Sequence, residues 1–264
     1  MTRRLFLKNS IPILGIFTLM SNKNKTMAKT VLHKSASRGS ANHGWLVSRH
    51  TFSFANYYNE ERMNFGALRV LNDDQVAAGE GFGTHPHRDM EIISIPLEGD
   101  LEHKDSMGNV SVIKKGDVQI MSAGRGIRHS EYNKNKEQQV KFLQIWVIPS
   151  QNNLTPSYDQ FNFDTIDKTD KIVEIITPTG NGNSLKIHQN AYFSLSNPKK
   201  GTSLKYKLNG NGQGVYVFLL SGNIEIEGQN LETRDGFGIW DTSEFTFTAK
   251  ENSEILFMEV PMNV

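Results

Sequence analysis

Residues 95–102 read IPLEGDLE, two short segments with apolar residues joined by a Gly-Asp turn. The pattern returns at residues 218–225, FLLSGNIE, around a Gly-Asn turn. A second glycine turn follows each copy, at Gly116 in the first half of the chain and at Gly236 in the second. This repeat predicts that one β-rich unit is present twice.

From Val31 onward the chain consists of short apolar runs separated by turns rich in glycine, asparagine and aspartate. The runs are residues 65–70, 92–97, 110–113, 118–121, 142–148, 172–176, 216–220, 223–227, 245–248 and 255–260. Many short strands punctuated in this way predict an all-β sandwich or barrel. Residues 151–169 are polar and interrupted by proline, so we expect them to link a domain at 27–150 to a domain at 170–264.

Composition excludes several kinds of chemistry. The chain has 264 residues and no cysteine, which rules out disulfides, thiolate metal sites and a catalytic thiol. Five of the 29 basic residues and none of the 28 acidic ones lie in residues 1–26, so the remainder has 24 basic and 28 acidic residues. A body with that net negative charge is not typical of a nucleic-acid-binding protein, and we expect no nucleic-acid partner.

Residues 1–26 differ from the body of the chain. A basic start is followed by an apolar stretch at 11–20 that is too short to span a bilayer, so no stable membrane anchor is expected. The order fits a signal peptide, and Arg3-Arg4 followed by LFLK resembles a twin-arginine signal for export to the periplasm. No Ala-x-Ala cleavage site follows, and Met27 offers an alternative start that would make 1–26 an upstream extension of a cytoplasmic protein.

Two segments carry side chains suited to metal binding. The segment GTHPHRDME contains His85 and His87, and the segment AGRGIRHSEYN contains His129 and Glu131. Side chains two residues apart on a strand point to the same face, so each pair can face the interior of a barrel. Three imidazoles and one carboxylate form a mixed nitrogen and oxygen site that suits a divalent transition metal.

These segments resemble the motifs of the cupin superfamily. Gly79, His85, His87 and Glu91 have the spacing of the first cupin motif, and residues 116–133 resemble the second. The resemblance implies a bicupin, with two double-stranded β-helix (jelly-roll-like) barrels in tandem. Within the superfamily the chain is most similar to bacterial pirins with quercetin 2,3-dioxygenase activity, through residues 41–45, 50–58, 68–74, 84–91, 119–124, 129–133 and 144–146.

The pirin resemblance implies one metal, bound in the N-terminal barrel by His85, His87, His129 and a carboxylate. The pirin pattern makes Glu131 that carboxylate, and we expect it to be both ligand and general base. The general cupin pattern would use Glu91, which stays the alternative ligand or base. Fe(II) is the expected ion, and Mn, Co, Ni or Cu also suit such a ligand set.

The C-terminal half lacks a comparable set of ligands. Its one histidine is His188, and the chain reads FGIWDT where a second histidine motif would follow the turn at Gly236. We therefore expect residues 170–264 to form a degenerate cupin domain without metal. His103, between Glu102 and Lys104, is expected to be solvated.

The pirin resemblance also implies an activity. The expected enzyme is a metal-dependent dioxygenase that opens flavonol-like substrates such as quercetin with O2 and releases carbon monoxide. The alternative is a non-enzymatic iron-binding sensor or protein-interaction module, because eukaryotic pirins are described as nuclear co-regulators. A sugar-modifying cupin is a third and weaker possibility, disfavoured by the histidine-rich pocket.

Overall fold

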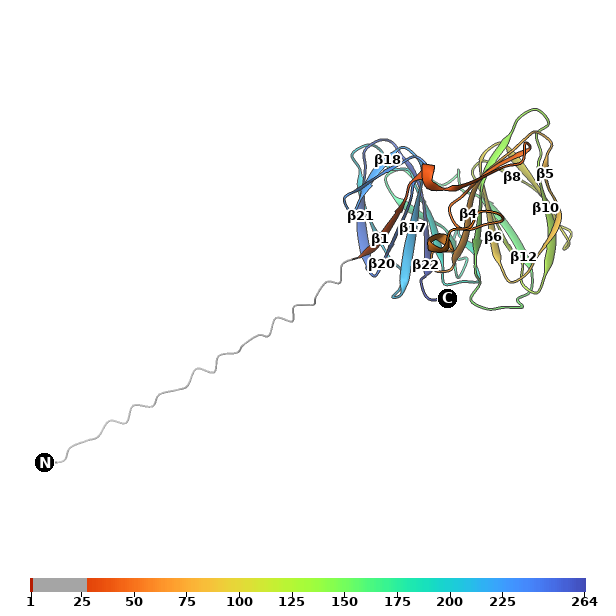
Figure 1. Ribbon diagram of the computed structural model, residues 1–264. Helices are drawn as coiled ribbons and strands as arrows, with labels where there is room; N and C mark the ends of the chain where they lie inside the picture. The colour runs from red at the N-terminus through yellow and green to blue at the C-terminus, as the bar shows by residue number, and fades with distance from the viewer. Residues whose placement is uncertain (2–27) are drawn as a thin grey trace.

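The computed structural model describes Met1 and residues 28–264, which form two β-barrels side by side (Figure 1). The all-β expectation is confirmed, since the described helices are two short 3-10 turns, η1 (Ser35–Ser37) and η2 (Glu60–Arg62). Among these described residues there is no helix with the length and apolar character needed to span a membrane. The export signal falls on residues outside the described part of the chain, and it stays a prediction.

Two antiparallel sheets form the N-terminal barrel. Its strands are β2 (Gly39–Asn42), β3 (Leu46–His50), β4 (Leu68–Val76), β5 (Gly81–His87), β6 (Glu91–Glu98), β7 (Asp100–Asp105), β8 (Val110–Lys114), β9 (Asp117–Ser122), β10 (Ile127–Asn133), β11 (Val140–Val147) and β12 (Ser157–Asn162). The larger sheet has the order β12-β9-β6-β11-β4-β3-β2, and the smaller one has the order β5-β10-β7-β8. The sequence segments with the candidate ligands lie on β5 and β10, two neighbours of the smaller sheet.

The C-terminal barrel repeats this plan. Its strands are β13 (Ile172–Thr177), β14 (Leu185–Lys186), β15 (Tyr192–Ser196), β16 (Ser203–Lys207), β17 (Gln213–Ser221), β18 (Asn223–Ile226), β19 (Gln229–Glu232), β20 (Gly236–Trp240), β21 (Glu244–Ala249) and β22 (Glu254–Pro261). One sheet has the order β1-β20-β17-β22-β15-β13-β14, where β1 is Lys29–His33, and the other has the order β16-β21-β18-β19. The repeat seen in the sequence is therefore a repeat of structure.

Each barrel receives an edge strand from a part of the chain that we did not assign to it. Strand β1, expected in the first domain, pairs with β20 of the second barrel. Strand β12 lies inside the expected linker, residues 151–169, and pairs with β9 of the first barrel. Its sequence SYDQFN is mostly polar because an edge strand with one solvated face needs few apolar residues. The segment therefore does more than connect the domains.

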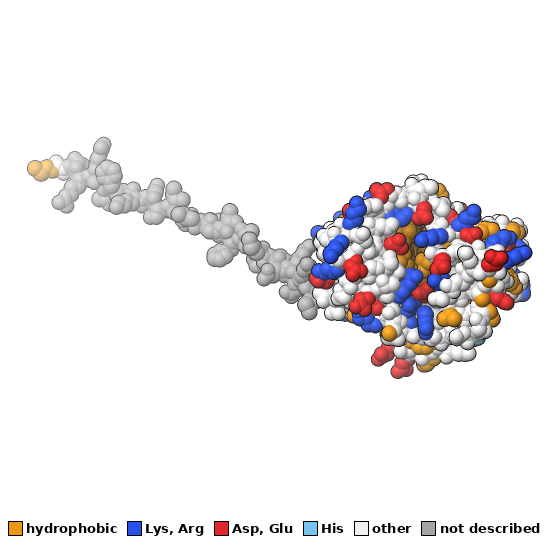
Figure 2. Space-filling view, turned by 90° about the horizontal axis from the view of Figure 1, so that it is seen from above, with side chains coloured by type: hydrophobic (Ala, Val, Ile, Leu, Met, Phe, Trp, Pro, Cys, Tyr) orange, Lys and Arg blue, Asp and Glu red, His pale blue; other side chains and the backbone are white. Residues whose placement is uncertain are grey.

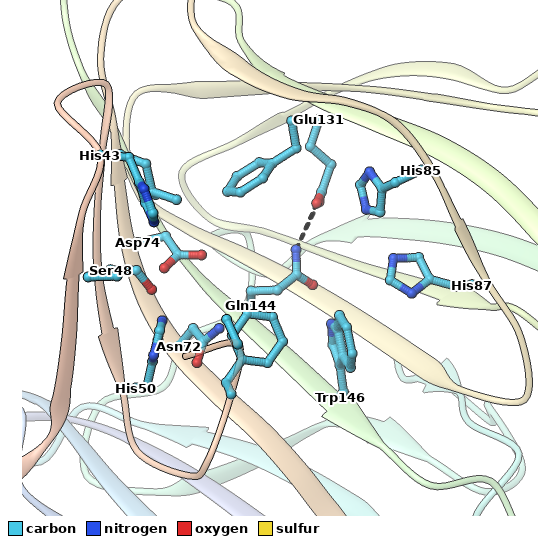
Figure 3. A pocket seen from close by; sticks show the side chains of 15 residues that line it. His43, Ser48, His50, Asn72, Asp74, His85, His87, Glu131, Gln144 and Trp146 are labelled. Atoms are coloured by element: carbon cyan, nitrogen blue, oxygen red, sulfur yellow. Dashed lines mark hydrogen bonds between the residues drawn. The ribbon is translucent and has the colours of Figure 1, made fainter. Parts of the chain in front are cut away.

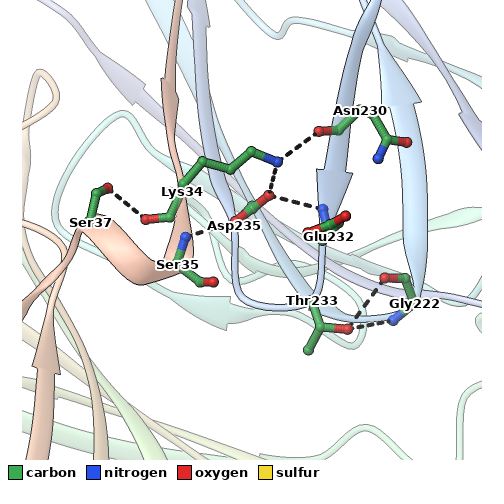
Figure 4. Close-up of polar contacts among 8 residues, drawn as sticks. All are labelled: Lys34, Ser35, Ser37, Gly222, Asn230, Glu232, Thr233 and Asp235. Carbon is green, nitrogen blue, oxygen red and sulfur yellow. Dashed lines mark hydrogen bonds and ion pairs between the residues drawn. The ribbon is translucent and has the colours of Figure 1, made fainter.

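A buried carboxylate of the second barrel anchors the segment that follows β1 (Figure 4). Asp235 is 1% exposed and accepts hydrogen bonds from the backbone NH groups of Ser35, at 2.7 Å, and of Glu232, at 3.0 Å. The ammonium of Lys34 lies 2.8 Å from the same carboxylate. Asp235 belongs to the glycine turn that the sequence repeat identified, so this turn also anchors the N-terminal segment.

The interiors of the two barrels differ in chemistry. The interior of the second barrel is packed with apolar side chains, among them Val217, Phe237, Phe247 and Phe257. Another apolar cluster joins residues of both large sheets, which places a shared core between the barrels. Seen from above, charged side chains of both signs are interspersed on the surface, and hydrophobic ones appear in the hollow between the barrels (Figure 2).

Candidate metal centre

Three imidazoles converge inside the N-terminal barrel. His85 and His87 lie on β5, and His129 lies on β10 directly opposite His85 in the antiparallel register. Nitrogen atoms of the three rings all lie within 4.8 Å of one another. The ring centroids of His85 and His129 are 4.4 Å apart, and that of His87 is 4.8 Å from each of them. The spacing seen in the sequence therefore brings three histidines to one point.

The hydrogen bonding of these imidazoles fits a metal ion. His129 is 2% exposed, and within the described structure neither of its ring nitrogens has a hydrogen-bond partner. A buried polar atom without a partner is costly, and coordination of a metal by one of these nitrogens would remove the cost for that atom. Nδ1 of His85 lies 2.8 Å from the carbonyl oxygen of Gly83, a contact that fixes the tautomer and leaves Nε2 with its lone pair.

The electrostatics of the group favour the form of histidine that binds metals. Burial, with smaller contributions from the neighbouring imidazoles of His129 and His85, lowers the pKa of His87 to about 3. Burial likewise lowers the pKa of His129 to about 3, with a smaller contribution from His85. Both rings are therefore neutral at pH 7, and neutral imidazole is the metal-binding species.

Glu131 lies beside the histidines and is held in place by two polar side chains. It is 3% exposed, and its carboxylate accepts a hydrogen bond from Ser94 Oγ, at 2.9 Å. The carboxylate also accepts hydrogen bonds from Gln144 Nε2, at 2.8 and 3.1 Å (Figure 3). The group of ligand atoms within 4.8 Å comprises the histidines and leaves out this carboxylate. Glu131 lines the same pocket as His85 and His87.

Sequence reasoning missed both partners of Glu131. Ser94 lies on β6 and Gln144 lies on β11, and these two residues are directly paired in the larger sheet. Each is a polar residue inside an otherwise apolar run, residues 92–97 and 142–148. A polar side chain at such a position is a usable signal, because a buried polar group needs a partner across the barrel.

The carboxylate of Glu91 lies outside the candidate metal site. It is 1% exposed, and its carboxylate accepts hydrogen bonds from Ser122 Oγ, at 2.6 Å, and from the backbone NH of His188, at 3.2 Å. His188 belongs to the C-terminal half, and its Nδ1 lies 3.5 Å from the same carboxylate. Glu91 is therefore placed at the junction of the two barrels and is not among the residues that line the pocket.

The expectation that His103 is solvated is wrong. Its side chain is fully buried on β7, opposite Glu131 in the register with β10. The ring stacks on Tyr158 with centroids 4.9 Å apart and lies 5.2 Å from the ring of His129. Alternation along β7 explains the error, because Leu101 and His103 face inward while the charged neighbours of His103 face solvent.

His85, His87 and Glu131 open onto a pocket of about 300 Å³, a size in the range of small-molecule sites. His85 and His87 lie on one side of it, with the rings of Phe82 and Trp146 among the apolar walls (Figure 3). Strands β3 and β4 contribute polar side chains to the opposite side, which are Ser48, His50, Asn72 and Asp74. Tandem β-barrels with imidazoles converging inside the first define a metal-binding bicupin.

Comparison with known proteins identifies the family. The Pirin family model matches residues 31–147, and the model for the quercetinase C-terminal cupin domain matches residues 174–260. Quercetin 2,3-dioxygenase of Escherichia coli strain K12 is 44% identical over 230 residues, which cover 87% of this chain and 98% of that protein. The chain belongs to the pirin family, which confirms the resemblance drawn from its motifs.

Solved structures agree with this assignment. The crystal structure of YhhW from Escherichia coli has a TM-score of 0.85 and 43% identity, covering 89% of this chain and 99% of that one. A structure of the bacterial pirin YhhW in complex with nickel(II) has a TM-score of 0.85 and 42% identity, with 89% and 100% covered. A pirin-like protein of Caulobacter vibrioides is 40% identical over 222 residues, covering 84% of this chain and 95% of that protein.

Proposed function

We propose that this protein is a metal-dependent dioxygenase of the quercetin 2,3-dioxygenase type. It would open a flavonol-like substrate with O2 and release carbon monoxide. The observation that carries the proposal is the convergence of three imidazoles beside a buried carboxylate at a pocket of about 300 Å³. The name of the Escherichia coli relative supports the choice of reaction, and the nickel(II) complex of YhhW supports the binding of a divalent metal.

The proposed ligands are His85, His87 and His129, with Glu131 as the carboxylate of the site. Fe(II) stays the proposed ion, and Ni(II) deserves equal testing because a solved relative contains it. When bound, a divalent cation supplies Lewis acidity, which lowers the pKa of the 3-hydroxyl group of the flavonol.

The chain itself supplies the base and the walls of the site. Glu131 accepts the proton of the substrate hydroxyl, and the donors Ser94 and Gln144 keep its carboxylate oriented toward the pocket. Trp146 lies with its ring centroid 4.9 Å from that of His87, so it borders the place where the substrate would meet the metal. The apolar walls limit the access of water to the reacting ring.

The test is turnover of quercetin under air by the full chain loaded separately with Fe, Ni, Mn, Co or Cu. We expect loss of the flavonol absorbance together with release of carbon monoxide, and neither with the metal-stripped protein or with His87→Ala. The decisive measurement is the formation of carbon monoxide by fully metal-loaded protein. Its absence with every metal would overturn the enzymatic proposal and leave the iron-binding sensor as the function to pursue.

A further inference from the structure

The pocket has a second polar wall that the proposed chemistry does not use. In the antiparallel pairing of β3 with β4, Ser48 lies opposite Asp74 and His50 lies opposite Asn72. Residues two apart on a strand share a face, so all four side chains point the same way. Each is at most 4% exposed, and all four line the pocket across from His85 and His87 (Figure 3).

Several atoms of this wall have no hydrogen-bond partner in the described structure. They are Asn72 Oδ1, Asp74 Oδ1 and His50 Nδ1, and beside the wall Gln144 Oε1 also has no partner. Three of the four are oxygen atoms that accept hydrogen bonds. Because buried polar groups in proteins are paired, a wall of unpaired acceptors indicates a ligand that brings donors.

The charge and shape of the pocket indicate which class of ligand would bind there. Burial raises the pKa of Asp74 to about 7, with an opposing effect of its hydrogen bond to Ser48, so near neutral pH this carboxyl group is partly protonated and can both accept and donate a hydrogen bond. A neutral donor such as a hydroxyl group suits such a wall better than a cation. The rings of Phe54 and Trp146, with centroids 5.4 Å apart, border the pocket and suit a flat aromatic ligand.

We propose that Asn72 and Asp74 form a recognition subsite for hydroxyl groups on the end of an aromatic substrate that lies farthest from the metal. The inference rests on the proposed function for the placement of the substrate, since the 3-hydroxyl end is the one assigned to the metal. Its consequence is selectivity: ring hydroxyls hydrogen-bond to the acceptors, and a substrate without them leaves these acceptors unpaired.

The test compares quercetin with 3-hydroxyflavone, which has the metal-binding hydroxyl and no other. We expect the metal-loaded protein to bind quercetin at least tenfold more tightly, measured as Kd by fluorescence quenching without oxygen. Replacing Asn72 by Leu should weaken quercetin binding roughly tenfold, the effect of one lost hydrogen bond, and leave 3-hydroxyflavone unchanged. Asp74→Leu should act in the same direction, and Asp74→Asn, which keeps an acceptor, should restore most of the affinity.

Gln75→Leu is the matched control, because Gln75 is exposed on the same strand β4. Metal content and Tm of each variant show whether the fold is retained. Equal losses for both ligands, or equal affinities in the parent protein, would overturn the subsite. Failure of the proposed function looks different, because quercetin would then be preferred in binding without any release of carbon monoxide.

Discussion

At the scale of single residues, the candidate site depends on how Glu131 is held. Its carboxylate receives two contacts from the amide nitrogen of Gln144 and one from the hydroxyl of Ser94. The amide therefore holds the carboxylate in one orientation at the pocket. Groups that orient a metal ligand in this way contribute to metal affinity although they do not touch the ion.

Replacing Gln144 by Leu removes this donor from a buried carboxylate. We expect the affinity for Ni(II) to fall about 10- to 100-fold, because an unsupported carboxylate is free to turn away from the site. Competition with a chelator of known affinity measures the change. Gln75→Leu controls for the loss of an amide elsewhere on the sheet, and an unchanged affinity in Gln144→Leu would show that the hydrogen bonds do not position Glu131.

The sequence predicted the meeting of the three histidines, because their motifs fix both strand and face. It did not predict Ser94, Gln144 or the burial of His103. Those positions depend on which strands become neighbours across the barrel, and strand pairing is a long-range property that local patterns do not encode. The polar wall on β3 and β4 was missed for the same reason.

At the scale of elements, β1 carries a titratable group into the second barrel. His33 is 7% exposed, and its Nδ1 lies 2.8 Å from the hydroxyl of Tyr216. Burial lowers the pKa of His33 to about 4, with a smaller contribution from Arg62. The imidazole of His33 therefore binds a proton more weakly in the folded protein than in the unfolded chain.

A defined dependence of stability on pH follows from His33. The contribution of His33 to the free energy of unfolding is constant above about pH 6.5. It decreases as the pH falls from there to about 4, with a loss of about 2 kcal/mol by pH 5. Urea unfolding at pH 7.5 and pH 5.0 measures it. His33→Gln should reduce the difference between the two pH values by that amount, and an equal difference in the variant would contradict the assignment.

Strands were predictable where their residues are apolar or alternate between apolar and polar, and less so at the edges of the sheets. The runs 92–97 and 142–148 correspond to the buried strands β6 and β11. The edge strand β12 is polar and was expected to be linker, and the partner of β1 lies in the other barrel. Edge strands need little apolar surface, so hydrophobic patterning gives weak information about them.

At the scale of the whole molecule, the two barrels touch through backbone as well as through side chains. The NH of Ala67, just before β4, donates to the carbonyl oxygen of Pro261 at the end of β22, with a distance of 2.9 Å. The neighbouring Gly66 has a φ of 52°, and a Cβ atom there would overlap that same carbonyl oxygen. Glycine is therefore required at this junction both by conformation and by space.

Gly66→Ala tests the junction directly. We expect it to destabilise the protein by about 2 kcal/mol more than Gly79→Ala, because it adds a clash with the backbone to the strain of a positive φ. Gly79 has a φ of 71° and open space around its Cα, so its substitution reports the strain alone. Urea unfolding of both variants measures the difference, and equal stabilities would mean that the barrels separate slightly to admit the methyl group.

The repeat in the sequence predicted a β-rich unit present twice, the cupin resemblance implied two barrels in tandem, and the family match agrees with that architecture. The pairing of β1 with the second barrel and the shared core could not be predicted from it, because a repeat describes each unit and says nothing of how two units pack. The sequence did predict that the interiors of the two barrels differ, because the histidine motifs occur in the first half only.

The proposed site holds one metal ion between the three histidines, with Glu131 beside it. Elemental analysis of the purified full chain, beside His87→Ala and Glu131→Ala, measures whether it does. His188→Ala is the control, because His188 does not line the pocket. We expect about one metal per chain in the parent and in the control, lost in His87→Ala and lost or greatly weakened in Glu131→Ala. A parent without metal after reconstitution with Fe, Mn, Co, Ni and Cu, or a His87→Ala variant that keeps its full metal content, would show that these histidines do not form a metal site.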